Sequence, residues 1–301
     1  MRTKWTDLAM EAQGGARADS RTLQSGIERT VVTIGDEDTA QRMGRPVGCY
    51  VTLSCPQMLS IELGMRRALS EELAGTIAGM LPEQCGTVLV TGLGNRSVTP
   101  DALGPRTVER VLVTRHMRGC MDEETRARMS DVCAAAPGVL GVTGIETAEV
   151  LRGMTEHVKP DAVIAVDALA ARSSRRICST IQITDTGITP GSGVGNHRQA
   201  LTMETLGIPV IAIGVPMVVY AWSIASDALR AMSEGLGDEQ DGEMLSACVE
   251  RVVSEQLGEM IVTPREVDAL VERMSGILAD GINQALHPLM TKPEIEQMMA
   301  Q

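Results

Sequence analysis

Two aspartates stand where a parallel sheet could bring them together. Asp101 follows an apolar, strand-like segment that ends near residue 92, and Asp167 directly follows another at residues 162–166. The active crevice of an open α/β sheet lies outside the carboxyl ends of its strands, so both carboxylates could face one crevice. Two close carboxylates can activate water, because the ionised one accepts a proton while its protonated neighbour polarises the carbonyl group. Repulsion between like charges makes double ionisation costly and divides these roles.

The same pattern has a purely structural alternative. Asp101 could be a residue at the entrance to a helix, and Asp167 could make ordinary hydrogen bonds at a strand end. If the two do form a pair, we expect Asp101 to be ionised, because a helix N-terminus favours negative charge. Asp167 would then hold the proton.

Glycine-rich segments lie at residues 92–95, 137–147 and 190–196, the first of them directly after a predicted strand. The first lacks the third glycine of the dinucleotide-binding motif GxGxxG, because Ser97 stands in its place, and a tight turn with positive φ explains it better. The last lacks the Lys-Ser/Thr pair of a P-loop and could be either a substrate-gripping loop or a surface turn. Together these loops suggest that backbone approaches another group closely, such as an extended peptide.

The other reactive side chains give weaker patterns. The four histidines form neither HExxH nor another close ligand pair, and no GxSxG motif supports a serine hydrolase. The cysteines lack the CxxC and Cys/His spacing of zinc sites, and Cys133 and Cys178 lack the signature of a catalytic cysteine. The sequence therefore predicts no metal site and no cofactor.

The elements that must position the aspartates follow a repeated order of strand, turn and helix. Continuous apolar strands separated by helices are typical of a mostly parallel sheet that helices cover on both faces. The sequence thus predicts one α/β domain. Its strands are expected at residues 31–34, 50–53, 88–90, 162–166, 177–183 and 210–215.

Helices are expected at residues 60–80, at about 105–117, and from Thr263 to about residue 286. The last has a clear start, because Thr263 can cap it, Pro264 suits the first helical position and Glu266 stands three residues after the cap. Residues 1–25 are polar and are expected to be irregular, and a loop is expected at residues 235–242. The chain should therefore end in helices.

Composition excludes several classes of protein. With 301 residues and a net charge of −12, the chain lacks the basic surface of a general nucleic-acid binder. Two Trp, two Tyr and no Phe cannot form an aromatic platform for single-stranded nucleic acid. No apolar run approaches the roughly 18 residues of a membrane span, and the N-terminus lacks the apolar core of a signal peptide. Seven cysteines without disulfide spacing indicate a reducing, cytosolic compartment.

Longer segments carry patterns specific enough to compare with known families. They read GLGNRSVTPDALGP (92–105), PGVLGVTGIET (137–147), VIAVDALAARS (163–173), TPGSGVGN (189–196), ETLGIPVIAIGVP (204–216), VTPREVD (262–268) and GINQALH (281–287). Together they resemble the germination proteases of spore-forming bacteria over nearly the whole chain.

This resemblance implies an endopeptidase that starts the degradation of small acid-soluble spore proteins during germination. The aspartates proposed as catalytic in the family lie in the PDALGP and DALAAR motifs, and they map onto Asp101 and Asp167. The resemblance also implies a homotetramer in the cytoplasm of the forespore or in the spore core. Its partners would be those spore proteins as substrates, with no direct contact to nucleic acid or membrane.

Family members are made as zymogens that remove their own N-terminal segment. The sequence TDLA at residues 6–9 resembles the processing motif, which has an acidic residue before the cut and an apolar residue after it. The match implies cleavage between Asp7 and Leu8. Residues 1–7 would then be a propeptide, and residues 8–301 would form a single peptidase domain.

Two departures from the family pattern stand out. The propeptide is shorter than usual, and Lys4 and Trp5 interrupt the usual Arg-Thr-Asp-Leu-Ala sequence, which bears on zymogen control. The segment between Ile224 and Val262 is also shorter than in relatives. That shortening removes none of the motifs quoted above.

A weaker similarity connects Asp101, Asp167 and the neighbouring Gly-Asn and Gly-Pro pairs with the hydrogenase-maturation endopeptidases. It implies a related fold. Those enzymes bind a metal ion with two corresponding acids, so a metal-assisted peptidase on the same scaffold stays open as an alternative. Carboxylates without a matching histidine are a poor site for a soft metal, which favours the aspartic-type interpretation. A catalytically silent binding module is the second alternative.

Overall fold

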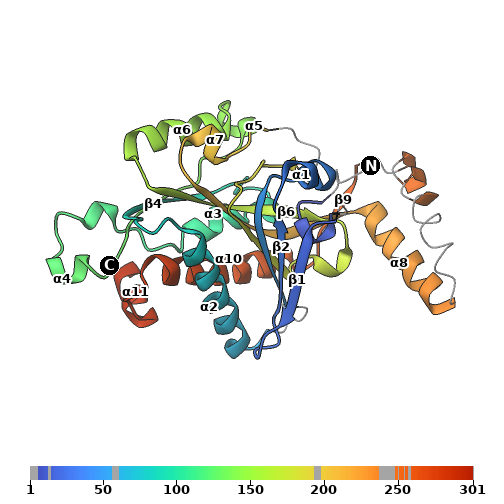
Figure 1. Cartoon of the computed structure of the whole chain (residues 1–301), viewed down its shortest axis with the longest axis horizontal. Helices are drawn as coiled ribbons and strands as arrows, with labels where there is room; N and C mark the ends of the chain where they lie inside the picture. The colour runs from blue at the N-terminus through green and yellow to red at the C-terminus, as the bar shows by residue number, and fades with distance from the viewer. Residues whose placement is uncertain are drawn as a thin grey trace.

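A computed structural model describes most of the chain and contains one large sheet with helices on both of its faces (Figure 1). The predicted α/β class is therefore confirmed. The residues that the structure describes are 6–12, 15–55, 61–192, 198–236, 248–249, 251–253, 255–256 and 259–300.

The described residues form a nine-stranded mixed sheet. Its strands are β1 (Arg17–Thr22), β2 (Glu28–Ile34), β3 (Gly48–Ser54), β4 (Thr87–Gly92), β5 (Asp131–Ala135), β6 (Ala162–Ala171), β7 (Thr180–Thr184), β8 (Val210–Tyr220) and β9 (Ile261–Val262). The order is β1-β2-β3-β7-β8-β6-β4-β5, with β9 paired to β8. Strands β5, β4, β6 and β8 run parallel to one another, whereas β1, β2, β3 and β7 pair antiparallel. The sheet thus has a parallel half and an antiparallel half that meet at β8.

The helices pack on the sheet or extend from its ends. They are α1 (Glu37–Met43), α2 (Leu63–Met80), α3 (Leu103–Val108), α4 (Glu123–Arg126), α5 (Leu140–Thr143), α6 (Thr147–Val158), α7 (Met203–Leu206), α8 (Ala221–Leu236), α10 (Val267–Leu286) and α11 (Lys292–Met299). Short 3₁₀ turns are η1 (Ala9–Glu11), η3 (Thr99–Asp101), η4 (Arg115–Met117) and η5 (Ser174–Arg176). The predicted helical C-terminal end is thus observed.

The two faces of β6 bury side chains against different helices. Ile164 and Val166 belong to a large core with α2, α3 and α10, whereas Val163 and Ala165 pack in a smaller core with α6 and α7. Figure 1 shows these two groups of helices on opposite sides of the sheet. Successive side chains of a strand alternate between faces, so Asp167 lies on the face of α6 and α7.

Strand β6 is longer than predicted, and this moves Asp167 into its interior. The expected strand ends at residue 166, but Ala168–Ala171 continue the pairing with Val215–Val219 of β8. The reason is that residues 168–171 are apolar and buried or half-buried, so they extend the strand. Asp167 is therefore an internal strand residue on a sheet face, not a strand-end residue.

Two predicted helices also start or end elsewhere. The helix expected at 105–117 is shorter, because α3 ends at Val108 and only the single turn η4 follows. The last helix begins at Val267 with Glu266 at its cap. Thr263 does not cap it, because the Thr263 hydroxyl donates to the Met217 carbonyl oxygen at 2.9 Å instead.

Three strands were missed by sequence patterning: β1, β5 and the two-residue strand β9. β1 falls in the segment expected to be irregular; it is an edge strand exposed along its whole length, so it has no apolar alternation to recognise. β5 is only five residues long and gains its place by parallel pairing with β4. The loop expected at residues 235–242 lies outside the described residues from residue 237 onward, and its first two residues belong to α8.

None of the described helices is both long enough and apolar enough to cross a lipid bilayer.

Candidate active site

A cavity of about 400 Å³ is lined by both predicted aspartates, Asp101 and Asp167. The three glycine-rich segments of the sequence meet at the same cavity, where Gly94, Gly141 and Gly191 form part of its wall. These loops therefore bring backbone close to the space in front of the carboxylates.

Asp167 projects from β6 and is only 4% exposed. Its Oδ1 accepts a hydrogen bond from the Ala168 N–H at 2.9 Å. Burial raises the pKa of Asp167 well above its usual range, and the negative charges of Asp101 and Asp7 raise it further. The environment of Asp167 therefore favours a protonated carboxyl group.

Asp101 stands at the end of η3, and its Oδ2 accepts a hydrogen bond from the Asn95 N–H at 2.7 Å. This contact requires a glycine before Asn95: Gly94 has a φ of +107°, and a Cβ there would lie 2.1 Å from the Asp101 carbonyl oxygen. The expected tight turn with positive φ is thus present. Burial raises the pKa of Asp101, while the Asn95 N–H opposes that rise.

The shifts in pKa favour an ionised Asp101 and a protonated Asp167, as predicted. The helix N-terminus that the prediction invoked is not the cause. Asp101 precedes only α3, a helix of six residues, and η3 is a single 3₁₀ turn, so a strong helix dipole is not available. The Asn95 N–H stabilises the ionised form of Asp101 instead, because a hydrogen bond to the charged form lowers a pKa. Asp167 is the more deeply buried partner and has the stronger tendency to keep its proton.

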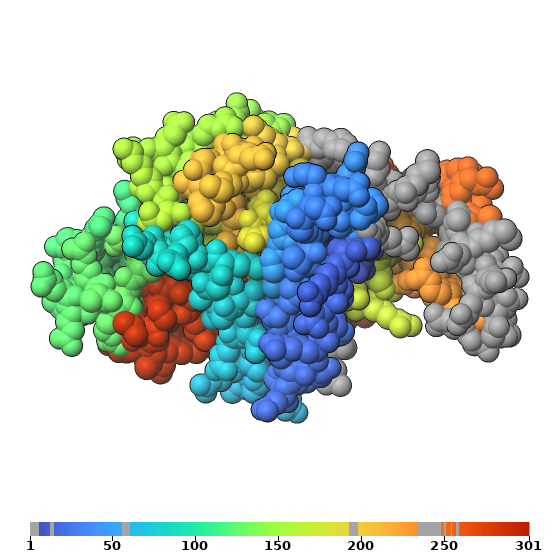
Figure 2. All heavy atoms as spheres, in the orientation of Figure 1, coloured from blue at the N-terminus to red at the C-terminus, as the bar shows by residue number. Residues whose placement is uncertain are grey.

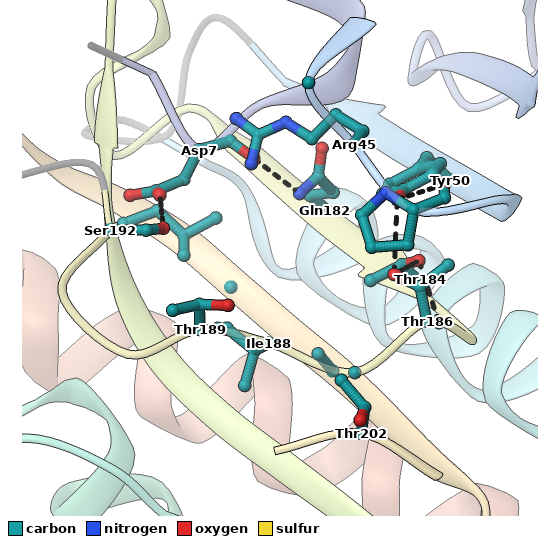
Figure 3. Close-up of a pocket in the computed structure, with 16 residues that line it drawn as sticks. Asp7, Arg45, Tyr50, Gln182, Thr184, Thr186, Ile188, Thr189, Ser192 and Thr202 are labelled. Atoms are coloured by element: carbon teal, nitrogen blue, oxygen red, sulfur yellow. Dashed lines mark hydrogen bonds between the residues drawn. The ribbon is translucent and has the colours of Figure 1, made fainter. Parts of the chain in front are cut away.

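Asp7, from the predicted processing motif, lines the same cavity as the two aspartates. Its backbone N–H donates to the Ala170 carbonyl oxygen at 2.9 Å, and the Ala170 N–H donates to Asp7 Oδ2 at 2.8 Å. The Ser192 hydroxyl donates to Asp7 Oδ1 at 2.7 Å (Figure 3). The chain beside the predicted cut is therefore held against β6 by main-chain and side-chain contacts.

Leu8, on the other side of the predicted cut, is fully buried. It packs with Leu169, Ala171 and Val219, at the ends of β6 and β8. Leu8 thus lies in an apolar pocket directly beside the acidic side chain of Asp7.

A second cavity, of about 200 Å³, also includes Asp7 in its wall. Its lining comes from strands of the sheet, including Gln182 of β7 and Gly214 of β8, and from the end of α1 and the turn before α7 at Gly44 and Thr202. Figure 2 shows these two regions, light blue and gold, side by side on one face of the molecule. Asp7 therefore lines both cavities.

Three polar residues that make hydrogen bonds to the N-terminal segment were not predicted individually as site residues from the sequence. Figure 3 shows Arg45, Gln182 and Ser192 around Asp7. Arg45 donates to the Thr6 carbonyl oxygen, and Gln182 Nε2 donates to the Asp7 carbonyl oxygen at 2.9 Å. One indication was available: Gln182 is a polar residue between two isoleucines of a strand expected to be apolar.

In the part of the chain that the structure describes, no three His, Cys, Asp or Glu side chains could hold a metal ion together. The described lining of the larger cavity contains no histidine or cysteine. Of the two cysteines considered from the sequence, Cys178 is buried, and burial raises the pKa of its thiol to about 12.

Comparisons with known proteins agree with the resemblance seen in the motifs. The family model described as germination protease matches residues 8–247. A germination protease of Caldanaerobacter subterraneus subsp. tengcongensis is 42% identical over 98% of this chain and 97% of its own length. Similar proteins are the germination proteases of Clostridium perfringens, 39% identical over 98% of both chains, and of Bacillus cereus, 40% identical over 94% of this chain and 93% of its own.

Among solved structures, a [NiFe] hydrogenase maturation protease, HycI from Thermococcus kodakarensis KOD1, aligns with 69% of this chain and 98% of its own. The identity is 17% and the TM-score is 0.36. The family model and the relatives are far more extensive matches, and they show that this chain belongs to the germination protease family.

Proposed function

We propose that this protein is an aspartic-type endopeptidase that starts the degradation of small acid-soluble spore proteins and that trims its own N-terminus. One observation carries the proposal: Asp7, Asp101 and Asp167 line one cavity. The bond after Asp7 is the predicted processing site, so the aspartate pair and a bond of the proposed type share one space.

The proposed reaction is addition of water to a peptide carbonyl. Ionised Asp101 accepts a proton from water as the water oxygen bonds to the carbonyl carbon, and protonated Asp167 donates to the carbonyl oxygen. Collapse of the intermediate breaks the C–N bond: one hydroxyl of the intermediate returns a proton to Asp167 as the C=O bond re-forms, and the leaving nitrogen takes up the proton that Asp101 had accepted from water. In self-processing the products are a carboxyl group on Asp7 and a free amine on Leu8.

The N-terminal segment acts in this proposal as a built-in substrate. Its acidic side chain is held by the Ala170 N–H and the Ser192 hydroxyl, and its leucine fills an apolar pocket. A tethered segment has a high effective concentration at the site and competes with other substrates. Residues 1–7 are therefore proposed to be a propeptide, with residues 8–301 as the peptidase domain. The new N-terminus at Leu8 must leave the groove before a spore protein can enter.

Assembly and location are proposed from family resemblance. We expect a homotetramer in the cytoplasm of the forespore or in the spore core, with spore proteins as partners and no direct contact to DNA. Native mass spectrometry of the purified chain tests the assembly state. A monomer at micromolar concentration would contradict that part of the proposal and leave the proposed chemistry intact.

The test of the reaction uses the purified full chain and a recombinant small acid-soluble spore protein. Wild type should cleave the added protein after trimming itself, while Asp101→Asn and Asp167→Asn should do neither. Asp19→Asn is the matched control, because Asp19 lies on the exposed edge strand β1. A parallel series with a metal chelator distinguishes a metal-assisted reaction, in which activity would be lost on chelation and restored by added metal ions.

A further inference from the structure

We infer that Gln182 is a catalytic residue that donates a hydrogen bond to the carbonyl oxygen of the bond to be cut. The inference rests on the proposed function, since it takes the Asp7–Leu8 bond as one that the site hydrolyses. It assigns the group that stabilises the oxygen on which negative charge develops as water adds.

The contacts of Gln182 span the predicted cut. Gln182 Nε2 donates to the Asp7 carbonyl oxygen at 2.9 Å, and Gln182 Oε1 accepts from the Ala9 N–H at 2.6 Å. An amide has one donating end and one accepting end, so only this orientation satisfies both contacts. Gln182 therefore holds the main chain on both sides of the Asp7–Leu8 bond and does so without contacting a substrate side chain.

The sheet places Gln182 opposite the aspartate pair. Gly214 of β8 is paired with Asp167 of β6 on one side and with Gln182 of β7 on the other. Residues paired across neighbouring strands project from the same face, so Gln182 and Asp167 lie on one face of the sheet. The Leu169 side chain packs over the glycine between them, since a Cβ at Gly214 would lie 2.4 Å from Leu169 Cγ. Gln182 lines the smaller cavity and Asp167 the larger one, and Asp7 lines both.

The position of Gln182 is fixed before a substrate arrives. Strand β7 lies inside the sheet between β3 and β8, and Gln182 is 7% exposed. Its neighbours Ile181 and Ile183 are fully buried in the core on the opposite face. A donor held in this way does not have to reorganise during the reaction, which is the property that makes oxyanion donors effective.

The two donors have different tasks in this arrangement. Asp167 transfers its proton to the carbonyl oxygen in the addition step, whereas Gln182 keeps its proton and shares it in a hydrogen bond. That hydrogen bond strengthens as charge develops on the oxygen, so it lowers the barrier more than it strengthens ground-state binding. Loss of a single oxyanion donor typically lowers kcat about 100- to 1000-fold.

The test measures kcat and KM for an added spore protein, together with the rate of self-trimming, in full-chain variants. Gln182→Met removes both contacts with little change in length. Gln182→Glu keeps the acceptor for the Ala9 N–H, but it can donate to the Asp7 carbonyl oxygen only when protonated. Thr184→Val is the matched control, because Thr184 lies two residues along β7 on the same face and lines the same cavity, but its hydroxyl bonds only with Thr186 in the described contacts. Circular dichroism and thermal unfolding check that each variant folds.

We expect Gln182→Met to lower kcat at least about 100-fold while KM changes less than about threefold. Gln182→Glu should be similarly slow at neutral pH, and its activity relative to wild type should rise as pH falls and the carboxyl group gains a proton. If Gln182→Met fails to fold, this pH-dependent ratio decides the question. Thr184→Val should retain the wild-type kcat.

A raised KM with kcat unchanged would show that Gln182 only anchors the chain and would overturn the inference. The inference would also be contradicted if the activity of Gln182→Glu relative to wild type did not vary with pH. The aspartate variants, measured in the same assay, separate this failure from failure of the proposed function. If wild type cleaves and Asp167→Asn does not, the proposed function stands whatever the result at Gln182.

Discussion

The two halves of the sheet contribute different parts of the site. The parallel half supplies both carboxylates: Asp167 projects from β6, and Asp101 lies on the turn after β4. The antiparallel half supplies side chains that donate hydrogen bonds to the main chain of the N-terminal segment: Gln182 on β7 and Arg45 just before β3. The halves meet at Gly214 of β8, and the Leu169 side chain packs in the space above that glycine. The candidate acid–base groups therefore all come from the parallel half, whereas main-chain contacts to the segment come from both halves, since Ala170 of β6 also pairs with Asp7.

The largest expected effect comes from the parallel half. Asp101→Asn or Asp167→Asn should lower the rates of self-trimming and substrate cleavage by a factor of about 10⁴ or more, because members of a catalytic unit fail together. Rates come from intact mass and gel analysis, with Asp19→Asn as control. Cleavage by either purified variant at near the wild-type rate would remove the pair from the mechanism.

The same substitution at Asp167 should stabilise the fold at neutral pH. The folded-state pKa of Asp167 is raised by burial, so its contribution to stability is present below the unfolded pKa near 3.8 and is lost as pH rises through the folded pKa. Asparagine carries no charge and escapes this loss. Thermal unfolding should therefore give a higher Tm for Asp167→Asn than for wild type at pH 7, and a difference that shrinks toward pH 4. A lower Tm at pH 7 would mean that the buried carboxylate is better compensated than its contacts indicate.

The pH dependence of kcat tests the division of roles within the pair. The proposed mechanism requires ionised Asp101 and protonated Asp167, so kcat should fall at low pH as Asp101 gains a proton and at high pH as Asp167 loses one. Both pKa values are raised by burial, so both limbs should lie above the usual aspartate range. A coupled pair titrates as a unit, and the two limbs describe the pair. A profile with no decline at high pH would contradict a protonated Asp167.

A smaller effect is expected from the peptide side of the contact. Asp7→Ala removes the acceptor for the Ala170 N–H and the Ser192 hydroxyl, and a hydrogen bond to a charged group contributes about 1.5–3 kcal/mol. Self-trimming should slow about 10- to 100-fold, as followed by N-terminal sequencing and intact mass. Ser192→Ala, which removes one of the two contacts, should slow it less. Equal rates of self-trimming for Asp7→Ala and wild type would mean that the site does not recognise the acidic side chain.

The smallest effect on cleavage is expected far from either half of the groove. His287, at the end of α10, is fully buried, and burial lowers its pKa to about 4, opposed by the Leu112 backbone. The folded state favours the neutral imidazole of His287. The free energy of unfolding should therefore fall by about 3 kcal/mol as pH drops from 6.5 toward 4. In His287→Leu this pH dependence should be weaker, while kcat at pH 7 stays unchanged. Denaturant unfolding at both pH values makes the comparison.

The two halves also differ in how much of them the sequence predicts. The parallel strands β4, β6 and β8 are continuous apolar segments, and the position of Asp101 and Asp167 beside them, together with the family motifs, identifies both residues. The polar edge strand β1 has no apolar alternation and escapes prediction. Gln182 escapes for another reason: its partners at residues 7 and 9 are more than 170 positions away, so no local pattern in the sequence connects them.

The most direct test of the account is an intact-mass time course of the purified full chain beside Asp167→Asn. The account predicts that wild type loses residues 1–7 and acquires Leu8 as its N-terminus, while the variant keeps Met1 throughout. Mixing the two chains then shows whether an active molecule can trim an inactive one. A wild-type enzyme that cleaves spore proteins but still begins at Met1, or an Asp167→Asn chain that trims at the wild-type rate, would contradict the account.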